Sequence, residues 1–245
     1  MNPEPILPVI TEPETIEAAS PAAEQHREEG PSLRKIVVRE AVSWAWVIIA
    51  FLFITGTIVQ ARVIPSGSME NTLLVGDHLL MSRLGYNAEL PLTQYHVRLW
   101  REPRRQQIVV FRAPLPGEPD YIKRLIGLPG DDLEIIEGVV YINGQSLKEP
   151  YRGTPPNVND NYGPVTVPQG EYFMMGDNRD DSYDSRYWGF VPHANIIGTP
   201  ILLYMSIDGP GEAWDPGHGR ERLFTYLKAL LHPGQVRWNR VFTMF

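Results

Sequence analysis

One segment of the chain is apolar without interruption. Residues 41–59, AVSWAWVIIAFLFITGTIV, contain no charged side chain. At about 1.5 Å per helical residue, such a run crosses a hydrocarbon layer of about 30 Å. A surface helix of a globular domain would carry polar positions on one face, whereas this segment is apolar on every face. The pattern therefore predicts a transmembrane helix rather than a core helix.

Basic residues are unequally distributed around this segment. Arg34, Lys35 and Arg39 precede it, whereas Arg62 alone follows closely. Because loops with more Lys and Arg stay in the cytoplasm, we expect the N-terminus to be cytoplasmic and the rest of the chain to lie across the membrane.

A cleaved signal peptide is the main alternative for the same segment. Residues 59–61, Val-Gln-Ala, offer small residues at a spacing that suits cleavage. However, the apolar run exceeds the usual h-region of about 7–15 residues, and a long tail precedes it. We therefore predict an uncleaved anchor, and whether residues 59–61 are ever cleaved stays open.

Beyond the anchor, the pattern changes to short apolar or alternating runs bounded by Gly, Pro, Asn and Asp, which is typical of β-strands. Four such runs stand out, at residues 107–111, 133–144, 171–177 and 199–206. Asn143-Gly144 predicts a hairpin turn, because a type I′ turn needs positive φ at both central residues. Strands do not alternate with long helices, so we predict a mainly β, antiparallel domain.

One short helix is predicted near the C-terminus. Residues 221–231, ERLFTYLKALL, place apolar side chains at positions 223, 224, 227, 230 and 231. This helix is too short to cross a membrane, so it either packs on the domain or lies in a lipid interface.

The N-terminal residues differ in composition from the rest. Residues 1–30 are rich in Pro, Glu and Ala and lack aromatic residues, so we expect them to be disordered. The predicted organisation is a disordered acidic, Pro-rich cytoplasmic tail at 1–33, a transmembrane anchor at 34–61 and a β domain at 62–245.

Composition excludes several classes of function. The formal net charge is −7 and no basic stripe occurs, so a nucleic-acid partner is not expected. The chain has no cysteine, which excludes disulfides and cysteine-type zinc sites. No two histidines are four residues apart, which argues against a helical metal pair.

Hydroxyl groups follow the apolar segment in the stretch VIPSGSMENTL, Val63–Leu73. Ser66 and Ser68 lie in a polar Pro/Gly bend. A serine hydroxyl is a poor nucleophile at neutral pH unless a base lies beside it. The histidines that could act as that base are His78, His96 and His193. However, neither serine lies in a G-x-S-x-G motif, which is typical of one class of Ser–His enzymes.

Lys123 is the other candidate base. A free lysine has a pKa near 10.4, so only about 0.1% is neutral at pH 7.4, and burial lowers that pKa. In DYIKRLIGLPGD, Lys123 shares a predicted strand face with Tyr121 and Leu125, which would remove the amine from water. A lone strand lysine is also typical of a solvated edge. The other lysines precede the anchor or have polar or helical surroundings: Lys35, Lys148 and Lys228.

A third stretch, MGDNRDDSYDSRYWGFVP, Met175–Pro192, is dense in charges and hydroxyls and ends in an aromatic cluster. It is consistent with a solvated surface loop. Alternatively, a serine of this loop orients the lysine amine while Asp–Arg pairs fix the loop.

Together these stretches resemble the type I signal peptidase family, in its bacterial and organellar branch. IPSGSMENTL resembles the nucleophile motif, Gly76-Asp77 the next motif, YIKRLIGLPGD the general-base motif, and GDNRDDSYDSRYWGFVP the C-terminal signature. The endoplasmic reticulum branch uses histidine where this chain has Lys123. The resemblance implies a compact antiparallel signal-peptidase/LexA-like β domain behind one transmembrane helix.

The resemblance also implies roles for individual residues. Ser68 would be the nucleophile and Lys123 the general base. Ser66 would donate its hydroxyl to the oxyanion hole beside the Ser68 N–H, and Ser182 would hydrogen-bond the lysine amine. Structural support would come from Asp177, Asp184 and Arg186.

The implied activity is removal of N-terminal signal peptides from exported preproteins through an acyl-enzyme, without metal or organic cofactor. The implied partners are signal peptides with small residues at −3 and −1, the lipid bilayer and the secretion translocon. The implied location is the bacterial inner membrane, with the catalytic domain on its outer face. The sequence does not distinguish a bacterial from an organellar membrane.

Two departures from the family pattern occur. Gln106-Gln107 stands where the family often has Gly-Asp before the IVVF strand, so we expect an altered turn. The short intervals between Ser68, Lys123 and Ser182 leave no room for a large inserted second domain.

Two rival interpretations remain at this stage. One is a catalytically silent, membrane-anchored β domain that binds exported peptides. The other is a self-cleaving Ser–Lys repressor of related fold, although such proteins carry a DNA-binding domain where this chain has an acidic tail and an apolar span.

Overall fold

The computed structural model describes residues 32–89, 96–98 and 102–245. The predicted disorder of residues 1–30 therefore falls outside the described residues. The chain divides into two compact units, Met1–Ala45 and Trp46–Phe245.

The apolar segment forms helix α1, Leu33–Phe53, with a mean hydropathy of 1.9 and no buried residue. Its length and composition suffice for a membrane span. The helix begins before the uncharged run, and a π-helical turn, Ile54–Ile58, follows it. Strand β1 then begins at Val59, so the last residue of the expected apolar span belongs to the β-sheet.

Trp46–Phe245 is built mainly from antiparallel strands, which confirms the predicted fold class. Its largest sheet has eight strands, in the order β1-β2-β13-β5-β6-β11-β12, with β14 paired to β13. These strands are β1 (Val59–Val63), β2 (Asp77–Ser82), β5 (Ile108–Phe111), β6 (Tyr121–Gly127), β11 (Glu171–Met175), β12 (Val191–Pro192), β13 (Ile196–Ser206) and β14 (Thr243–Met244).

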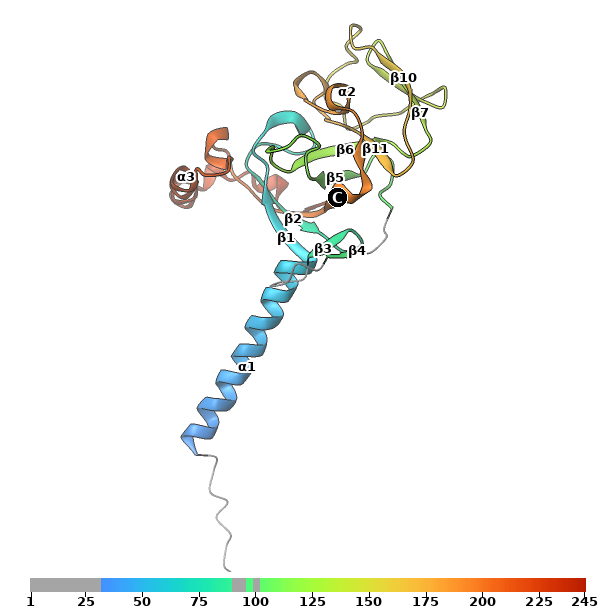
Figure 1. The fold of residues 1–245 in the computed structure, drawn as a ribbon. Helices are drawn as coiled ribbons and strands as arrows, with labels where there is room; N and C mark the ends of the chain where they lie inside the picture. Colours follow the sequence, from blue (N-terminus) through green and yellow to red (C-terminus); the bar gives the residue numbers. More distant parts are fainter. Residues whose placement is uncertain (1–31, 90–95, 99–101) are drawn as a thin grey trace, which may run out of the picture. The chain divides into compact units, whose positions relative to one another are not determined.

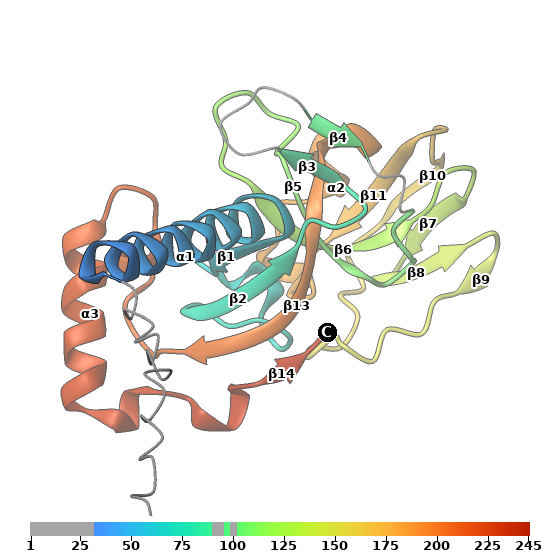
Figure 2. The same cartoon turned by 90° about the horizontal axis from the view of Figure 1, so that it is seen from below.

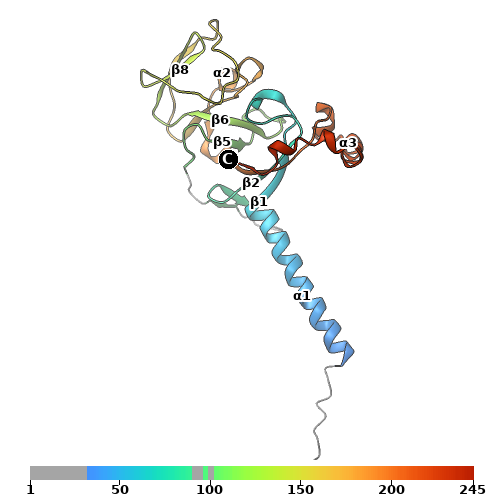
Figure 3. The same cartoon turned by 180° about the vertical axis from the view of Figure 1, so that it is seen from behind.

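The remaining described strands form two smaller sheets. A four-stranded sheet has the order β10-β7-β8-β9, and β3 pairs with β4. Their bounds are β7 (Asp132–Ile136), β8 (Val139–Ile142), β9 (Gln145–Ser146), β10 (Tyr162–Thr166), β3 (Asn87–Glu89) and β4 (His96–Arg98). The four-stranded sheet and helix α3 (Gly219–Leu231) lie at opposite ends of this unit (Figure 1), also when it is viewed from below (Figure 2) and from behind (Figure 3).

The structure contains the hairpin predicted at Asn143-Gly144. Both residues have positive φ, 51° and 77°, and β8 pairs with β9 across them. The run at 133–144, taken as one apolar stretch in the sequence, is divided by a second such turn. Glu137 and Gly138 have φ of 50° and 75° between β7 and β8. Gly138 is required there, because a Cβ would lie 2.5 Å from the Asn157 backbone nitrogen.

The core of the unit lies between these sheets and under α3. The predicted strands supply fully buried side chains such as Phe111, Leu125 and Phe173. Trp188, from the short helix α2 (Ser185–Trp188), packs half-buried against the same core. Helix α3 matches the prediction for residues 221–231, and its Ala229 packs near Trp214. Burial of these side chains accounts for most of the favourable folding free energy.

Candidate active site

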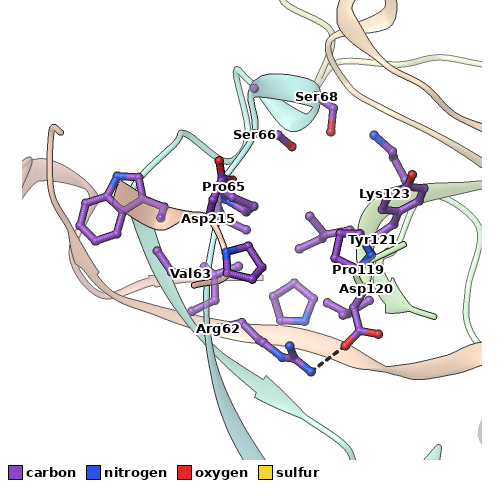
Figure 4. Close-up of a pocket in the computed structure, with 18 of the residues that line it drawn as sticks. Arg62, Val63, Pro65, Ser66, Ser68, Pro119, Asp120, Tyr121, Lys123 and Asp215 are labelled. Atoms are coloured by element: carbon purple, nitrogen blue, oxygen red, sulfur yellow. Dashed lines mark hydrogen bonds and ion pairs between the residues drawn. The ribbon is translucent and has the colours of Figure 1, made fainter. Parts of the chain in front are cut away.

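A cavity of about 710 Å³ opens between strand β1, the loop that follows it, and the start of strand β6. It contains three of the residues singled out in the sequence, Ser66, Ser68 and Lys123. Figure 4 shows the hydroxyl of Ser68 and the amine of Lys123 pointing toward each other across it. The lining does not include the predicted support residues Asp177, Asp184, Arg186 and Ser182.

Ser68 sits in a short 3₁₀ helix, Gly67–Met69, just after β1. Met69 is fully buried and anchors this turn in the core, and Ser68 is 9% exposed. The Asn178 backbone N–H donates to the Ser68 carbonyl oxygen at 3.2 Å, and its side-chain amide donates to the Gly67 carbonyl oxygen at 3.2 Å. Residues 176–192, which we call the signature loop, thus fix the backbone that carries the Ser68 hydroxyl.

Ser66 is the N-cap residue of the same turn, with extended backbone and an exposed side chain. Its hydroxyl makes no capping hydrogen bond to the turn. In Figure 4 it points into the cavity on the same side as Ser68. A free hydroxyl beside a backbone N–H is a donor pair suited to stabilising negative charge on an oxygen.

Lys123 lies on β6 and is only 4% exposed. Burial lowers the pKa of its amine from 10.5 to about 8, and the charge of Asp184 partly opposes this shift. Its Nζ lies 6.0 Å from the centre of the Tyr121 ring, so the two side chains share a face as predicted. The amine is therefore a usable base near neutral pH, not a solvated strand-edge charge.

Ser182 is buried, and its Oγ has no hydrogen-bond partner among the described residues. It lies close to Gly176, where an added Cβ would lie 2.3 Å from the Ser182 Oγ and 2.4 Å from the Ser68 carbonyl oxygen. Glycine at this position lets the signature loop approach the turn that carries Ser68. An unsatisfied buried hydroxyl is costly unless it has a partner in some state of the protein.

Asp177 is fully buried beneath the nucleophile turn and binds Arg124, the neighbour of Lys123 in sequence. The Arg124 Nε and Nη2 donate to its two carboxylate oxygens at 2.7 and 2.6 Å, and the Thr72 hydroxyl also donates to it. A bidentate pair of this kind fixes both geometry and charge. Asp177 therefore joins β6, the segment that carries Ser68 and Thr72, and the signature loop.

Asp184 and Arg186 fix the signature loop from within. The Asp184 carboxylate accepts from the Gly176 N–H at 3.1 Å and from the Arg186 Nε at 2.9 Å. Arg186 also donates to Asp160 at 2.7 Å and to the Arg179 carbonyl oxygen at 2.6 Å. Burial alone would lower the pKa of the Arg186 guanidinium, but the carboxylates of Asp184 and Asp160 raise it above its usual value, so the pairs stay charged.

The histidines considered as alternative bases do not share the cavity with Ser68 in the part of the chain that the structure describes. No histidine is among the described residues that line the cavity. The Nδ1 of the buried His78 hydrogen-bonds the Gly76 carbonyl oxygen at 2.9 Å, and its Nε2 hydrogen-bonds the Tyr226 hydroxyl at 2.8 Å. His78 therefore links β2 to α3. Within the described part of the chain, no group of three His, Asp or Glu residues is arranged to hold a metal ion.

Sequence reasoning missed several residues around the site. Arg124, Thr72 and Gly176 were not singled out, nor were Arg62 and Asp120, which face each other in the cavity. A charged residue directly after Lys123 in an otherwise apolar strand was a usable signal, because a buried Arg needs a carboxylate. The cross-chain partners themselves give no sequence signal.

Comparison with known families gives one match over most of the chain. The family model "Signal peptidase, peptidase S26" matches residues 37–205. The match includes α1 from Val37 onward and every residue of the cavity wall up to β13.

Curated relatives agree with this match. A probable signal peptidase I-2 of Synechocystis sp. is 39% identical over 159 residues, 63% of this chain and 66% of that protein. A signal peptidase I of Leptolyngbya laminosa is 35% identical over 206 residues, 81% of this chain and 92% of that protein. A signal peptidase I of Rickettsia typhi is 34% identical over 252 residues, which are 85% of this chain and 94% of that protein.

A solved structure is also similar in sequence. The crystal structure of a signal peptidase I from Enterococcus faecalis V583 is 39% identical, covers 40% of this chain and 97% of its own, and has a TM-score of 0.36.

Proposed function

Because this chain belongs to the signal peptidase family, peptidase S26, and is a membrane serine endopeptidase that cleaves signal peptides from preproteins, we propose that Ser68 and Lys123 are its catalytic dyad. The observation that carries the proposal is the buried Lys123 amine, with a pKa lowered to about 8, facing the Ser68 hydroxyl in one cavity. The rival interpretation as a silent peptide-binding domain is not favoured.

The first half of the reaction forms an acyl-enzyme. Neutral Lys123 takes the proton of the Ser68 hydroxyl, and the Ser68 Oγ attacks the carbonyl carbon of the scissile bond. The Ser68 N–H and the Ser66 hydroxyl stabilise the negative oxygen of the tetrahedral intermediate. When the C–N bond breaks, the Lys123 ammonium returns the proton to the departing amine of the mature protein.

The second half releases the signal peptide. A water molecule gives its proton to Lys123 and attacks the ester carbonyl, and the Ser68 Oγ leaves with the proton from the ammonium. Ser182 supports both halves in this proposal, because its unpartnered buried hydroxyl accepts a hydrogen bond from the amine as it changes protonation. Asp177, Asp184 and Arg186 act through the loop backbone and do not touch substrate.

The groove between β1 and β6 binds the residues that precede the cleaved bond, in extended form. β1 is an end strand of the large sheet, so its outer edge has free backbone donors and acceptors. The apolar lining near Ser68, including Ile64 and Ile122, suits small side chains at −1 and −3.

A cleavage assay tests the dyad. Purified enzyme is incubated with a preprotein, and the Ser68→Ala and Lys123→Ala variants are compared with wild type. Loss of processing in both variants supports the proposal, and processing by either variant at the wild-type rate rejects it. Labelling with a serine-directed acylating inhibitor, present in wild type and absent in Ser68→Ala, identifies the nucleophile independently.

The proposed orientation places the N-terminus in the cytoplasm and the catalytic unit on the outer face of a bacterial inner membrane, near the secretion translocon. The basic residues before the uncharged run support it. Because the chain has no cysteine, single cysteines report topology directly. In intact cells a membrane-impermeant maleimide should label Val158→Cys, which is 64% exposed, and not Leu33→Cys. The reverse pattern rejects the orientation.

Helix α3 supports the lipid bilayer as a partner of the catalytic unit. One face, with Thr225 and Ala229, is buried, whereas the other exposes five large apolar side chains to solvent. They are Leu223, Phe224, Leu227, Leu230 and Leu231. An amphipathic helix of this kind lies well in a lipid interface, and the candidate span α1 ends only a few residues before β1.

Fluorescence tests the lipid contact. A nitrobenzoxadiazole dye on Leu230→Cys, in full-length protein reconstituted into vesicles, should be quenched by doxyl-labelled lipids. The same dye on Val158→Cys serves as the control. Equal quenching at the two positions would reject the proposed contact between α3 and lipid.

A further inference from the structure

Among the described residues, two strand edges at the cavity have no partner strand. β1 pairs with β2 on one side only. On β6, strand β11 pairs from Arg124 onward, so the preceding residues have a free edge on that side. Both edges line the same cavity. An extended peptide between them can hydrogen-bond to both, and it must then pass every side chain that spans the gap.

One pair of side chains spans the gap. The Arg62 Nη2 of β1 donates to the Asp120 Oδ2, directly before β6, at 2.7 Å. Figure 4 shows this ion pair across the cavity, at the end away from Ser68. We call Arg62 and Asp120 the clasp.

The clasp has unused hydrogen-bonding capacity. The Nε of Arg62 is buried and has no hydrogen-bond partner among the described residues. Within the described part of the chain, the other side-chain hydrogen bond of Arg62 is long, 3.5 Å from Nη2 to the Gln60 Oε1. A guanidinium with five donors is therefore engaged mainly by one carboxylate oxygen.

The clasp is also easy to open. The side chains of Arg62 and Asp120 are 38% and 27% exposed, so water screens their attraction. A partly exposed pair of this kind stabilises a protein only weakly. By contrast, the Arg124–Asp177 pair behind the cavity is fixed by two short bonds and full burial of the carboxylate.

The position of the clasp defines which substrate residue meets it. Asp120 is three residues from Lys123, which at about 3.3 Å per strand residue is about 10 Å along the groove. An extended peptide with its scissile carbonyl at Ser68 has its third or fourth preceding residue at that distance.

We infer that Arg62 and Asp120 together determine how the enzyme discriminates charge at the third and fourth residues before the cleaved bond. This inference rests on the proposed function of the groove. With both residues present, the two charges cancel and neutral substrate side chains are preferred. Without Asp120, the freed guanidinium attracts an acidic substrate residue. Without Arg62, the freed carboxylate attracts a basic one.

The test measures kcat/KM for peptide substrates that differ only at the third or the fourth residue before the cleaved bond, with Ala, Glu or Lys there. The wild-type enzyme should cleave the Glu and Lys peptides at similar rates, both below Ala. Asp120→Asn should favour Glu over Lys by about five-fold, and Arg62→Gln should favour Lys by a similar factor, as expected for partly screened charges. The exchange variant Arg62→Asp with Asp120→Arg should restore similar rates.

A matched control removes a comparable ion pair elsewhere. Asp208 bonds Arg237 at 2.8 Å and does not line the cavity, so Asp208→Asn should keep the wild-type ratio. If the ratio of kcat/KM for the Glu and Lys peptides is unchanged in both single variants while the Ala peptide is still cleaved, the inference about the clasp is rejected and the proposed function is not. A failure of every variant to cleave any charged peptide has the same meaning. If the wild-type enzyme leaves the Ala peptide uncut, the proposed function fails, and the clasp fails with it.

Discussion

The two faces of strand β6 bury a cation each, with opposite consequences. Lys123 faces the cavity at 4% exposure and makes no ion pair among the described contacts. Arg124, the next residue, is 8% exposed and bonds both oxygens of Asp177. Burial without a counter-ion lowers the pKa of the lysine to about 8, whereas burial with one keeps the arginine charged.

The contrast shows how one strand serves both chemistry and structure. A lysine releases its proton when burial destabilises its charge, and it then becomes a base. An arginine does not release its proton, so its burial requires a carboxylate and produces a rigid joint. The joint of Arg124 and Asp177 holds the signature loop against the strand that carries the base.

The largest effect is expected on the cavity face. Lys123→Ala should lower kcat by about 10³-fold, because the Ser68 hydroxyl loses its base. Lys123→Arg should be equally inactive, because a guanidinium stays protonated. Preprotein cleavage under single-turnover conditions measures both. Appreciable activity of Lys123→Arg would show that positive charge, not proton transfer, is what the site requires.

The opposite face should dominate stability. Arg124→Met leaves the Asp177 carboxylate buried without its partner, which should lower the free energy of unfolding by about 3–5 kcal/mol. Lys123→Met removes a buried cation that has no partner and should not lower it. Urea denaturation of the protein in detergent micelles compares the two variants. Equal destabilisation by both would remove the distinction between the faces.

The two faces should also differ in their response to pH. Only the neutral amine of Lys123 is a base, so kcat/KM should rise about ten-fold per pH unit and level off above an apparent pKa of about 8. A rise centred near the pKa of histidine, lost on mutation of a histidine, would contradict this assignment.

Stability should follow the same titration. The folded pKa of Lys123, about 8, is below the unfolded value of 10.5, so the unfolded state binds more protons between these limits. The free energy of unfolding should therefore increase from pH 8 to 10.5, by about 3 kcal/mol, and lose this gain as the pH falls. The difference between wild type and Lys123→Met isolates this contribution. A difference that is independent of pH would contradict the shifted pKa.

The smallest effect concerns the third member of the Arg124 joint. Thr72 donates its hydroxyl to Asp177 and accepts from the Arg124 Nη2 at 3.2 Å. Thr72→Val should lower the free energy of unfolding by about 1 kcal/mol without moving the apparent pKa of activity. Thr243→Val, which removes an exposed hydroxyl bond to the Arg240 carbonyl oxygen, is the matched control. A moved pKa in Thr72→Val would mean that the two faces are coupled.

Much of the fold was predictable because its signals are local. The alternation and turn residues of the sequence predicted β5, β11, β13 and the β8–β9 hairpin. The splitting of residues 133–144 was missed, because Glu137-Gly138 resembles an ordinary polar pair until its backbone is seen in a tight turn. The uncharged run by itself does not mark the ends of α1, which begins at Leu33 before the run and ends at Phe53 within it.

The candidate site was only partly predictable. The sequence motifs indicated Ser66, Ser68, Lys123 and the signature loop, and three of these residues share the cavity. The partners Asp120 for Arg62 and Thr72 for Asp177 were not predictable, because each pair joins segments that are far apart in the chain. A side chain's partner across such a distance depends on strand order and register.

The sequence by itself determined an apolar span and an antiparallel β domain, and it indicated a candidate serine nucleophile and a candidate lysine base, because these depend on residue type, short motifs and local periodicity. Only the tertiary structure decided that Lys123 loses its solvation without gaining a counter-ion while Arg124 gains one. Desolvation and ion pairing depend on what the folded chain places around a group. For this reason one of two adjacent basic residues has a lowered pKa, whereas the other is held in its charged form by a carboxylate.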